Sequence, residues 1–183
     1  MIYNSSEMEL RAALSAAERV CAAARTAPKA KGWDNIVTLT LTDKDKDAVA
    51  AMMDKLSEQH GMDFLSRDAG NVRAAQVLVL IGIREGTRGL QDICGYCHYK
   101  NCAECAEKGG VCVYDPMDVG IALGSAAAAA ADCRVDSRIL FSAGRAAKEL
   151  GIMGEGVGMV CGLPLSVSGK SPFFDRKKKD QAK

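Results

Sequence analysis

The residues best suited to chemistry in this chain are cysteines that crowd into one short segment. Five of the eight cysteines lie between Cys94 and Cys112, in the run C-G-Y-C-H-Y-K-N-C-A-E-C-A-E-K-G-G-V-C. Thiols in two C-x-x-C pairs on a turn-rich segment point toward a common centre, as a metal ion or an iron–sulfur cluster requires. Gly95 follows the first cysteine and keeps the turn open where the backbone passes the ligated atom. The segment therefore predicts a metal-binding site.

Three kinds of thiol chemistry are open for this segment. A disulfide framework would need an oxidising compartment, and the chain starts without the basic and apolar stretches of a secretory signal. A structural zinc site would use four of the five cysteines in a tetrahedron. An iron–sulfur cluster takes thiolates at separate corners, which suits the uneven spacing of Cys94, Cys97, Cys102 and Cys112. Cys105 is an alternative fourth ligand.

The remaining candidates for chemistry are few. Cys21, Cys133 and Cys161 are scattered among apolar residues, and we expect them to be small core residues. His98 lies inside the cysteine segment, where we expect a neighbour of the metal rather than a ligand. The sequence indicates no catalytic acid–base pair, so the catalytic residues are unknown at this stage.

Composition is that of an ordinary globular protein. Its 183 residues are enough for one domain with a sizeable core, and the formal net charge is +1. With 5% aromatic residues and no broad basic stripe, the chain lacks the surface of a nucleic-acid-binding protein. No charge-free apolar stretch is long enough for a membrane span. We expect a cytoplasmic protein, where thiols and clusters survive, without nucleic-acid or membrane partners.

Apolar periodicity, caps and breakers predict an α+β domain in which helices pack on a small mixed sheet. Ser6 and Glu9 form a capping box, and Asp115 precedes Pro116 as an N-cap precedes the first helical residue. The expected elements are a helix from Ser6 to before Pro28, a strand over 36–41, a helix through Val49 and Leu56 ending at Gly61, a central strand over 76–83, a helix from Asp115, a helix from Ser137 to Gly151, and a strand over 159–163. Residues 1–183 would form a single domain, into which residues 90–114 are inserted as the cysteine-rich loop.

The helix after the cysteine segment has an unusual composition. Residues 119–131 carry no charge and are mostly glycine, alanine and serine, which predicts burial on all sides. Gly120 and Gly124 lie about one turn apart and allow a second helix or a flat ligand to approach the backbone. A helix that seeks close partners in this way predicts a homodimer.

Two loops have residues suited to binding an anion. In residues 24–35 we single out Arg25, Thr26, Pro28 and Lys29, although cations that complement the end of a helix dipole are an alternative explanation. Residues 164–171 resemble a phosphate-binding P-loop, but Pro172 prevents the helix that the motif needs. An anion-binding turn remains an interpretation of this region, with candidates Ser168, Lys170 and Arg176.

Several short motifs resemble the FMN-dependent nitroreductases. The helix end Ala24-Arg25-x-Ala27-Pro28, the run Asp118-Val-Gly120-Ile-Ala122 and the turn Gly162-Leu-Pro164-Leu165 with Lys170 and Arg176 are the residues that carry this resemblance. The resemblance implies the nitroreductase fold, which is dimeric by habit. It also implies an FMN whose phosphate lies between residues 25–35 and 166–176.

Two further resemblances concern the cysteines and the chain as a whole. The run from Cys94 resembles the small four-iron four-sulfur module that begins C-G-x-C-G-x-x-x-C, although His98 stands where that module has glycine. Asp136-Ser-Arg138 and the ending Pro-Leu-Ser-x-Ser-Gly-Lys-x-Pro-Phe-Phe-Asp-Arg resemble a family of uncharacterised proteins described as containing a ferredoxin domain. This family name implies electron transfer.

Together these observations predict a redox protein. Electrons would pass through the cluster, possibly to a bound flavin that acts on a small molecule or a protein partner, as in a flavin-dependent oxidoreductase. No G-x-G-x-x-G follows a strand, so a protein donor is expected rather than a bound nicotinamide coenzyme. The alternative is a non-enzymatic module that holds zinc and binds a partner or an anionic ligand.

Overall fold

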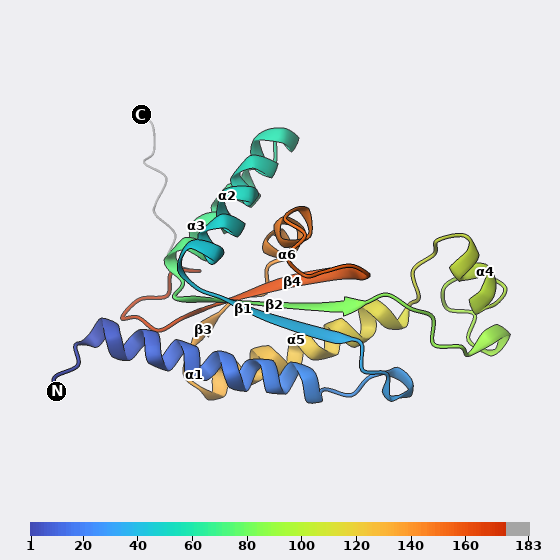
Figure 1. Ribbon diagram of the computed structural model, residues 1–183, viewed down its shortest axis with the longest axis horizontal. Coiled ribbons are helices and arrows are strands. Elements are labelled where there is room, and N and C mark those ends of the chain that lie inside the picture. The colour runs from blue at the N-terminus through green and yellow to red at the C-terminus, as the bar shows by residue number, and fades with distance from the viewer. Residues whose placement is uncertain (175–183) are drawn as a thin grey trace.

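The computed structural model describes residues 1–174. Its framework is a four-stranded sheet in the order β1-β2-β4-β3, with helices on both faces (Figure 1). The strands are β1 (Ile36–Leu41), β2 (Val77–Arg84), β3 (Asp136–Ser137) and β4 (Val157–Ser166). The α+β class and the small sheet are confirmed. Every pairing is antiparallel, however, so the expectation of a mixed sheet is wrong.

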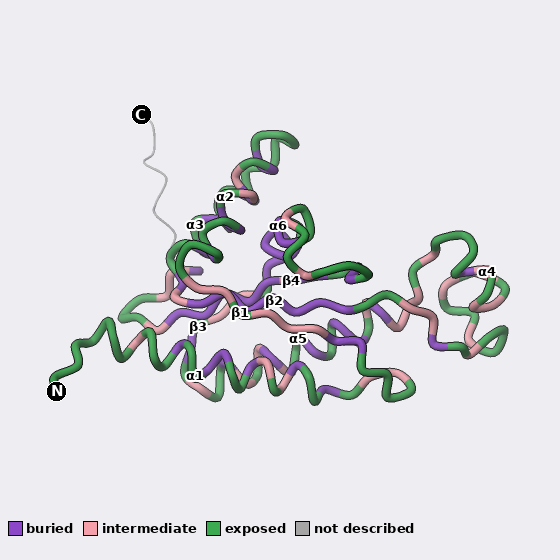
Figure 2. The backbone as a smooth tube through the Cα atoms, in the orientation of Figure 1, coloured by how far each residue is buried: buried purple, intermediate pink, exposed green. Residues whose placement is uncertain are grey.

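β2 is the buried centre of the sheet, as its nearly continuous apolar sequence predicts. Its side chains from Val77 to Ile83 are all buried (Figure 2). Ile83 lies opposite Ile36 of β1, and Val77 lies opposite Leu165 of β4. The register therefore puts the chain before β1 at one end of β2 and the chain after β4 at the other end.

One face of the sheet is covered by two long helices, α1 (Ser5–Thr26) and α5 (Tyr114–Asp132), which lie side by side (Figure 1). Small buried side chains such as Ala17, Ala24 and Ala126 allow the close approach. The capping box of α1 lies two residues before the predicted one. Asn4 Oδ1 accepts from the Glu7 amide at 2.9 Å, and the Glu7 carboxylate accepts from the Asn4 amide at 2.9 Å.

α5 is buried on one side only, which contradicts the expectation of burial all round. Val119, Ala122 and Ala126 face the core, whereas Gly120 and Gly124 are exposed. A Cβ added at either glycine would meet nothing within 4 Å among the described residues. The outer side of the charge-free run is therefore an open stripe of small and apolar residues. No helix within residues 1–174 is both long and apolar enough to cross a membrane.

The opposite face carries α2 (Asp43–His60), α3 (Asp63–Ala74) and α6 (Phe141–Glu149). Gly61 ends α2 with φ 64, as its predicted role as a C-terminal cap requires. α3 was not predicted, because only Leu65, Ala69 and Val72 mark its apolar side. With two helices rather than one between β1 and β2, the chain reverses three times rather than twice. This explains why β2 runs antiparallel to β1.

α6 begins later than the predicted start at Ser137. Ser137 pairs with Leu165 in β3, and Leu140 exchanges two backbone hydrogen bonds with Gly162, at 2.8 and 2.9 Å. These sheet contacts keep residues 137–140 extended, so the helix starts only at Phe141. β4 is longer than the predicted 159–163 for the same reason, since its later residues pair with β3.

The cysteine segment leaves the end of β2 and projects away from the sheet before the chain returns as α5 (Figure 1). It contains the short helices η2 (Gln91–Ile93) and α4 (Cys102–Glu107). A third short helix, η1 (Ala30–Gly32), lies in the loop between α1 and β1. The segment and this loop both border the end of the sheet at which β2 finishes.

The contact between α6 and β4 depends on Gly144. A Cβ at this position would lie 1.8 Å from the carbonyl oxygen of Val160. We expect Gly144→Ala to lower the free energy of unfolding by about 3 kcal/mol, because a helix must move off the sheet. Gly70→Ala in α3 is the matched control, since its Cβ would meet nothing within 4 Å. It should gain about 0.5–1 kcal/mol. Urea unfolding measures both, and an equal effect of the two would contradict the argument.

Candidate functional site

All five cysteines of the segment line one small hollow. The remaining wall comes from the strand exit and the start of α5: Thr87, Arg88, Leu90, Gln91, Gly95, Val113 and Tyr114. The structure thus brings together the four predicted ligands and the alternative ligand Cys105. The wall has thiols but no carboxylate, and His98 lies outside it. This donor set is soft and suits a thiolate-bound metal or cluster.

The backbone of the segment turns sharply where the chain must wrap around the hollow. Gly95 has φ 64, and Gly109 has φ 63. His98 also adopts a left-handed conformation, with φ 65. The resembled iron–sulfur module has glycine at this position, and glycine adopts the left-handed conformation without strain. A histidine held in this conformation costs about 1–2 kcal/mol. Asn101 caps α4 by accepting from the Glu104 amide at 2.9 Å and so orients Cys102 and Cys105.

The five thiols differ in burial. Cys105 is 1% exposed, and the other four are half-buried. Burial, a hydrogen bond with Cys97 and the neighbouring thiols together raise the pKa of Cys105 to about 11. Burial and the adjacent Cys94 raise the pKa of Tyr114 above its ordinary value. Without a metal, Cys105 is therefore a protonated thiol at neutral pH.

The side chains are not closed around a single ion. Among residues 1–174, no three His, Cys, Asp or Glu side chains are grouped closely enough to hold one metal ion. The thiols face a shared space, in which Cys97 and Cys105 are within hydrogen-bond reach but no third thiol joins them closely enough for one ion.

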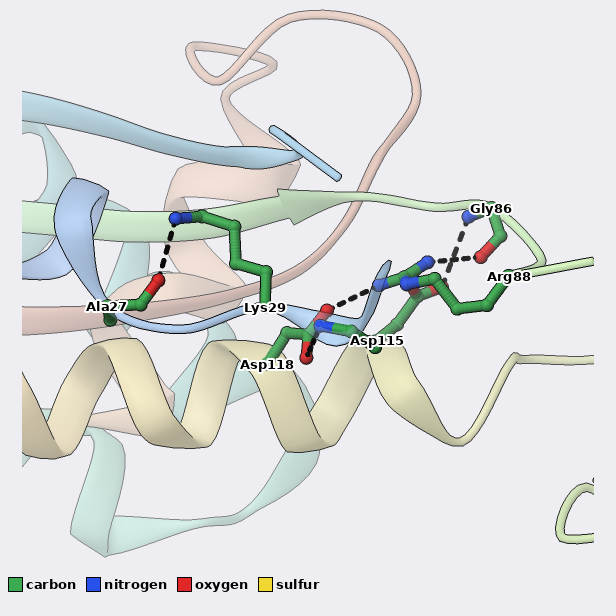
Figure 3. A network of polar contacts seen from close by, with 7 residues as sticks. Ala27, Lys29, Gly86, Arg88, Asp115 and Asp118 are labelled. Carbon is green, nitrogen blue, oxygen red and sulfur yellow. Dashed lines mark hydrogen bonds and ion pairs between the residues drawn. The ribbon is translucent and has the colours of Figure 1, made fainter. Parts of the chain in front are cut away.

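A buried ion network supports the wall of the hollow (Figure 3). The side chain of Arg88 is 1% exposed and lies between Asp115 and Asp118, each 3% exposed. Arg88 Nη1 lies 2.9 Å from Asp115 Oδ1, and Nη2 lies 2.8 Å from Asp118 Oδ2. Gly86 accepts from Nη1 through its carbonyl at 2.5 Å and donates its amide to Asp115 at 3.2 Å. Burial alone would lower the pKa of Arg88, but the bonds to Asp118 and Asp115 raise it above its ordinary value.

The same network holds the loop before β1. The Ala30 amide donates to Asp118 Oδ1 at 3.0 Å. With the Asn35 amide in the orientation that satisfies both its ends, Asn35 accepts from Arg88 Nη2 at 2.7 Å and donates to the Trp33 carbonyl at 3.0 Å. The Trp33 ring lies 5.5 Å from the guanidinium carbon. One guanidinium thus joins the cysteine hollow, α5 and residues 30–35.

Sequence reasoning missed this network. It assigned Asp115 as an N-cap, but α5 begins at Tyr114, and the buried Asp115 pairs with Arg88 instead. The signal was present, because Asp115 and Asp118 lie three residues apart on one side of a helix that has no other charge before Asp132. Two buried carboxylates need a buried cation. The sequence does not say which residue supplies this cation, because Arg88 is thirty residues from Asp118 in the chain.

The first group of predicted flavin ligands lines a second hollow of ≈ 750 Å³ that includes Arg25, Thr26, Pro28 and Lys29. Its cations are already engaged in the loop. Arg25 donates to Asp34 at 2.7 Å and to the Ile36 carbonyl, which holds the pKa of Asp34 below its ordinary value. Lys29 donates to the Ala27 carbonyl (Figure 3). It also donates to the Arg25 carbonyl and so caps the end of α1. These contacts agree with the alternative explanation, in which the cations complement the end of helix α1.

The second group lies elsewhere. Ser168 and Lys170 follow β4, and the Ser168 hydroxyl donates to the Lys170 carbonyl. Arg176 lies outside the described residues. Six residue steps of β2 separate Ile83, beside the first group, from Val77, beside the second, which is about 20 Å. Within one chain, the structure does not bring the two groups together.

A third hollow, of ≈ 860 Å³, lies between α6, β4 and the cysteine segment. Its walls include Val111, Phe141, Arg145, Lys148 and Val160. Val111 adjoins Cys112 in the chain, so this space borders the cysteine hollow.

With the fold and the cysteine hollow described, similar proteins identify the family. A protein of Archaeoglobus fulgidus is 37% identical over 187 residues, which covers 98% of this chain and 100% of that protein. The model of a family described as "uncharacterized protein containing a ferredoxin domain" matches residues 108–176. The chain belongs to this ferredoxin-domain family. The resemblance to this family, stated from the sequence, is confirmed.

Solved structures confirm the nitroreductase fold. A nitroreductase with bound FMN from Desulfitobacterium hafniense is 15% identical, with a TM-score of 0.56 over 85% of this chain and 78% of that one. Nitroreductase CinD from Lactococcus lactis, in complex with chloramphenicol, is 14% identical, with a TM-score of 0.59 over 86% and 79% of the chains. Identities this low establish a shared fold and nothing finer.

The buried network makes a direct prediction for stability. Arg88→Ala should lower the free energy of unfolding by about 3–5 kcal/mol, because it leaves two buried carboxylates without a cation. Arg84→Ala, an exposed arginine four residues earlier, should change it by less than about 0.5 kcal/mol. Urea unfolding measures the difference. Equal values would mean that the carboxylates find another partner.

Proposed function

We propose that this chain is a redox protein whose cysteine segment holds an iron–sulfur cluster and whose fold holds a flavin. The observation that carries the proposal is the single hollow lined by all five cysteines of residues 94–112. Cys94, Cys97, Cys102 and Cys112 are the proposed ligands, with Cys105 as the alternative fourth. Membership of a ferredoxin-domain family supports the redox assignment.

The spread of the thiols favours a cluster over a single ion. Zinc needs four ligands at about 2.0–2.3 Å from one centre. Thiolates that bind a four-iron four-sulfur cluster are attached to different iron atoms and stand further apart. Residues 1–174 hold no three ligand side chains grouped for one ion, yet five thiols share the hollow. A four-iron four-sulfur cluster is therefore the proposed centre.

FMN is the proposed flavin because structures of the same fold contain it. One chain cannot bring residues 25–35 and 168–170 to one phosphate, since these loops lie at opposite ends of β2. We propose that the site forms between two copies. The hollow beside Pro28 and Lys29 would come from one copy, and Ser168 and Lys170 from the other. Arg176 joins the second group by its place in the sequence.

The outer side of α5 is the proposed contact between the copies. Met117 and Ile121 are 47% and 44% exposed, and Gly124 and Ala128 continue the same stripe. Spacings of three and four residues keep these positions on one side of the helix. A homodimer would bury this apolar stripe, which has no neighbour within the described part of the chain.

A bound flavin can exchange single electrons with a cluster and electron pairs with an organic molecule. The chain's own residues prepare the sites for such chemistry. Arg25 and Lys29 hold the turn after α1 through bonds within the loop, and Arg88 holds that turn against the cysteine hollow. The hollow beside Val111 and Phe141 has room for a small-molecule substrate. A protein partner that exchanges electrons would meet the projecting cysteine segment.

The alternative function is a zinc-holding module without enzymatic activity. The same thiols favour it, because four of them suffice for a structural zinc site. Such a module would bind a partner or an anionic ligand through its exposed loops. Anaerobically purified protein separates the two proposals: brown or yellow protein supports the redox protein, whereas colourless protein with stoichiometric zinc supports the module.

Serine substitutions test the ligand set. Cys97→Ser should abolish the metal centre, because an iron or zinc atom loses a thiolate. Cys105→Ser should leave it largely intact, and His98→Gly should leave the metal content unchanged, since His98 lies outside the hollow. Iron, sulfide and zinc analysis with visible absorption measures each. Equal loss in Cys97→Ser and Cys105→Ser would make Cys105 the fourth ligand.

A mixing experiment tests the shared flavin site. Lys170→Ala should weaken FMN binding roughly ten- to hundredfold, as expected for one lost bond to a charged phosphate. Arg25→Ala should also weaken it, because the loop loses its bonds to Asp34 and Ile36. A dimer that combines one copy of each variant keeps one intact site if each site uses both copies. Fluorescence titration should then recover high-affinity binding at half stoichiometry. No recovery would contradict a site built from two chains.

A further inference from the structure

Arg88 has one hydrogen-bond donor that the protein itself does not use. A guanidinium has five N–H groups. Nη1 donates to the Gly86 carbonyl and forms an ion pair with Asp115 Oδ1 at 2.9 Å, and Nη2 serves Asp118 and Asn35. Among the described residues, neither Nε nor Asp115 Oδ1 has a hydrogen-bond partner, although both are buried. Leaving a buried donor unpaired costs free energy, so such a group calls for an explanation.

The position of Arg88 supplies that explanation. Its side chain lines the cysteine hollow, and it is 1% exposed. Without a metal, the thiols that line the hollow are weak hydrogen-bond acceptors. Metal binding deprotonates cysteine ligands and so creates anionic sulfur in the hollow. A buried N–H group beside anionic sulfur gains a charge-assisted hydrogen bond that it lacks beforehand.

We propose that Arg88 is a positioning residue that couples the cysteine hollow to residues 30–35. When the hollow is loaded, Nε donates to a cysteine or cluster sulfur. The two Nη groups meanwhile hold Asp118, which binds the Ala30 amide, and Asn35. Loading of the metal centre therefore orders the loop that borders the proposed flavin site. The inference rests on the proposed metal centre but not on which metal fills it.

Hydrogen exchange at the Ala30 amide reports the coupling without any activity assay. In the parent protein, loading with zinc alone or with iron and sulfide should slow exchange over residues 30–35 roughly tenfold, the effect of one hydrogen bond to a charged group. In Arg88→Lys this difference should disappear. Lysine keeps the positive charge, but its single ammonium group cannot bond the sulfur and the loop partners at the same time as Nε and the two Nη groups of arginine can. Arg84→Lys changes an exposed arginine four residues earlier in the chain and should behave as the parent.

The reduction potential gives a second reading in iron-loaded protein. A donor to sulfur stabilises the reduced, more negative cluster. Arg88→Lys should therefore shift the midpoint potential to a lower value, and Arg84→Lys should leave it unchanged. A purely structural role for Arg88 would alter stability but not the potential.

The outcomes separate the inference from the proposed function. If the protein takes up zinc but no cluster, the redox proposal fails, and the zinc-loaded exchange experiment still decides the coupling. If a cluster forms but loading slows exchange equally in the parent and in Arg88→Lys, the inference is overturned and the redox proposal stands. If neither metal binds, both fail.

Should Arg88→Lys unfold, Asn35→Ala replaces it. That variant removes one of the bonds from Arg88 to the loop and should weaken the coupling, and an unchanged tenfold difference would contradict it.

Discussion

Two carboxylates buried in the first turns of α5 require a buried cation, and the placement of Arg88 follows from this need. Desolvating Asp115 and Asp118 is costly unless a positive charge meets them. Arg88 reaches them from the stretch that follows β2 and leads into the cysteine segment. The remaining arms of the guanidinium then hold residues 30–35 against α5. The ion pair thus determines where the strand exit, the helix start and the loop before β1 meet, and the cysteine hollow forms beside that junction.

The antiparallel sheet divides the candidate sites between its two ends. The cysteine segment and the loop of residues 25–35 both lie where β2 finishes, whereas Ser168 and Lys170 lie where it starts. The proposed metal centre and the first part of the proposed flavin site are therefore neighbours within one chain, which suits the proposed electron exchange. The second part of the proposed flavin site lies at the other end of the sheet, and the apolar outer stripe of α5 offers a surface for the proposed second copy. The direction of one strand thereby links the proposed homodimer to the proposed flavin site.

Local patterns in the sequence predicted what local forces determine. The strand at Ile36–Leu41, the buried strand β2 and the cap at Gly61 follow from side-chain alternation, apolar content and backbone freedom. The cysteines were recognisable because their chemistry is unusual at any spacing. Features set by distant contacts were not predictable in this way. The helix α3 has a weak apolar side, α6 is delayed by the pairing of Leu140 with Gly162, and α5 is open on one side because no element within residues 1–174 covers it. The partner of Asp118 was hidden for the same reason.

Asp118 illustrates how a motif acquires physical meaning. In the sequence it was one letter of the run Asp-Val-Gly-Ile-Ala, which resembles a flavoprotein family. In the structure, Oδ2 accepts from Arg88 and Oδ1 accepts from the Ala30 amide, so both oxygens are used inside the protein. An aspartate in this position therefore joins α5 to the loop before β1 whether or not a flavin is present. The fold can retain this residue for architecture alone. Support for a bound group must consequently come from groups that the described part of the chain leaves unsatisfied, and the Nε of Arg88, a residue in the wall of the cysteine hollow, is such a group.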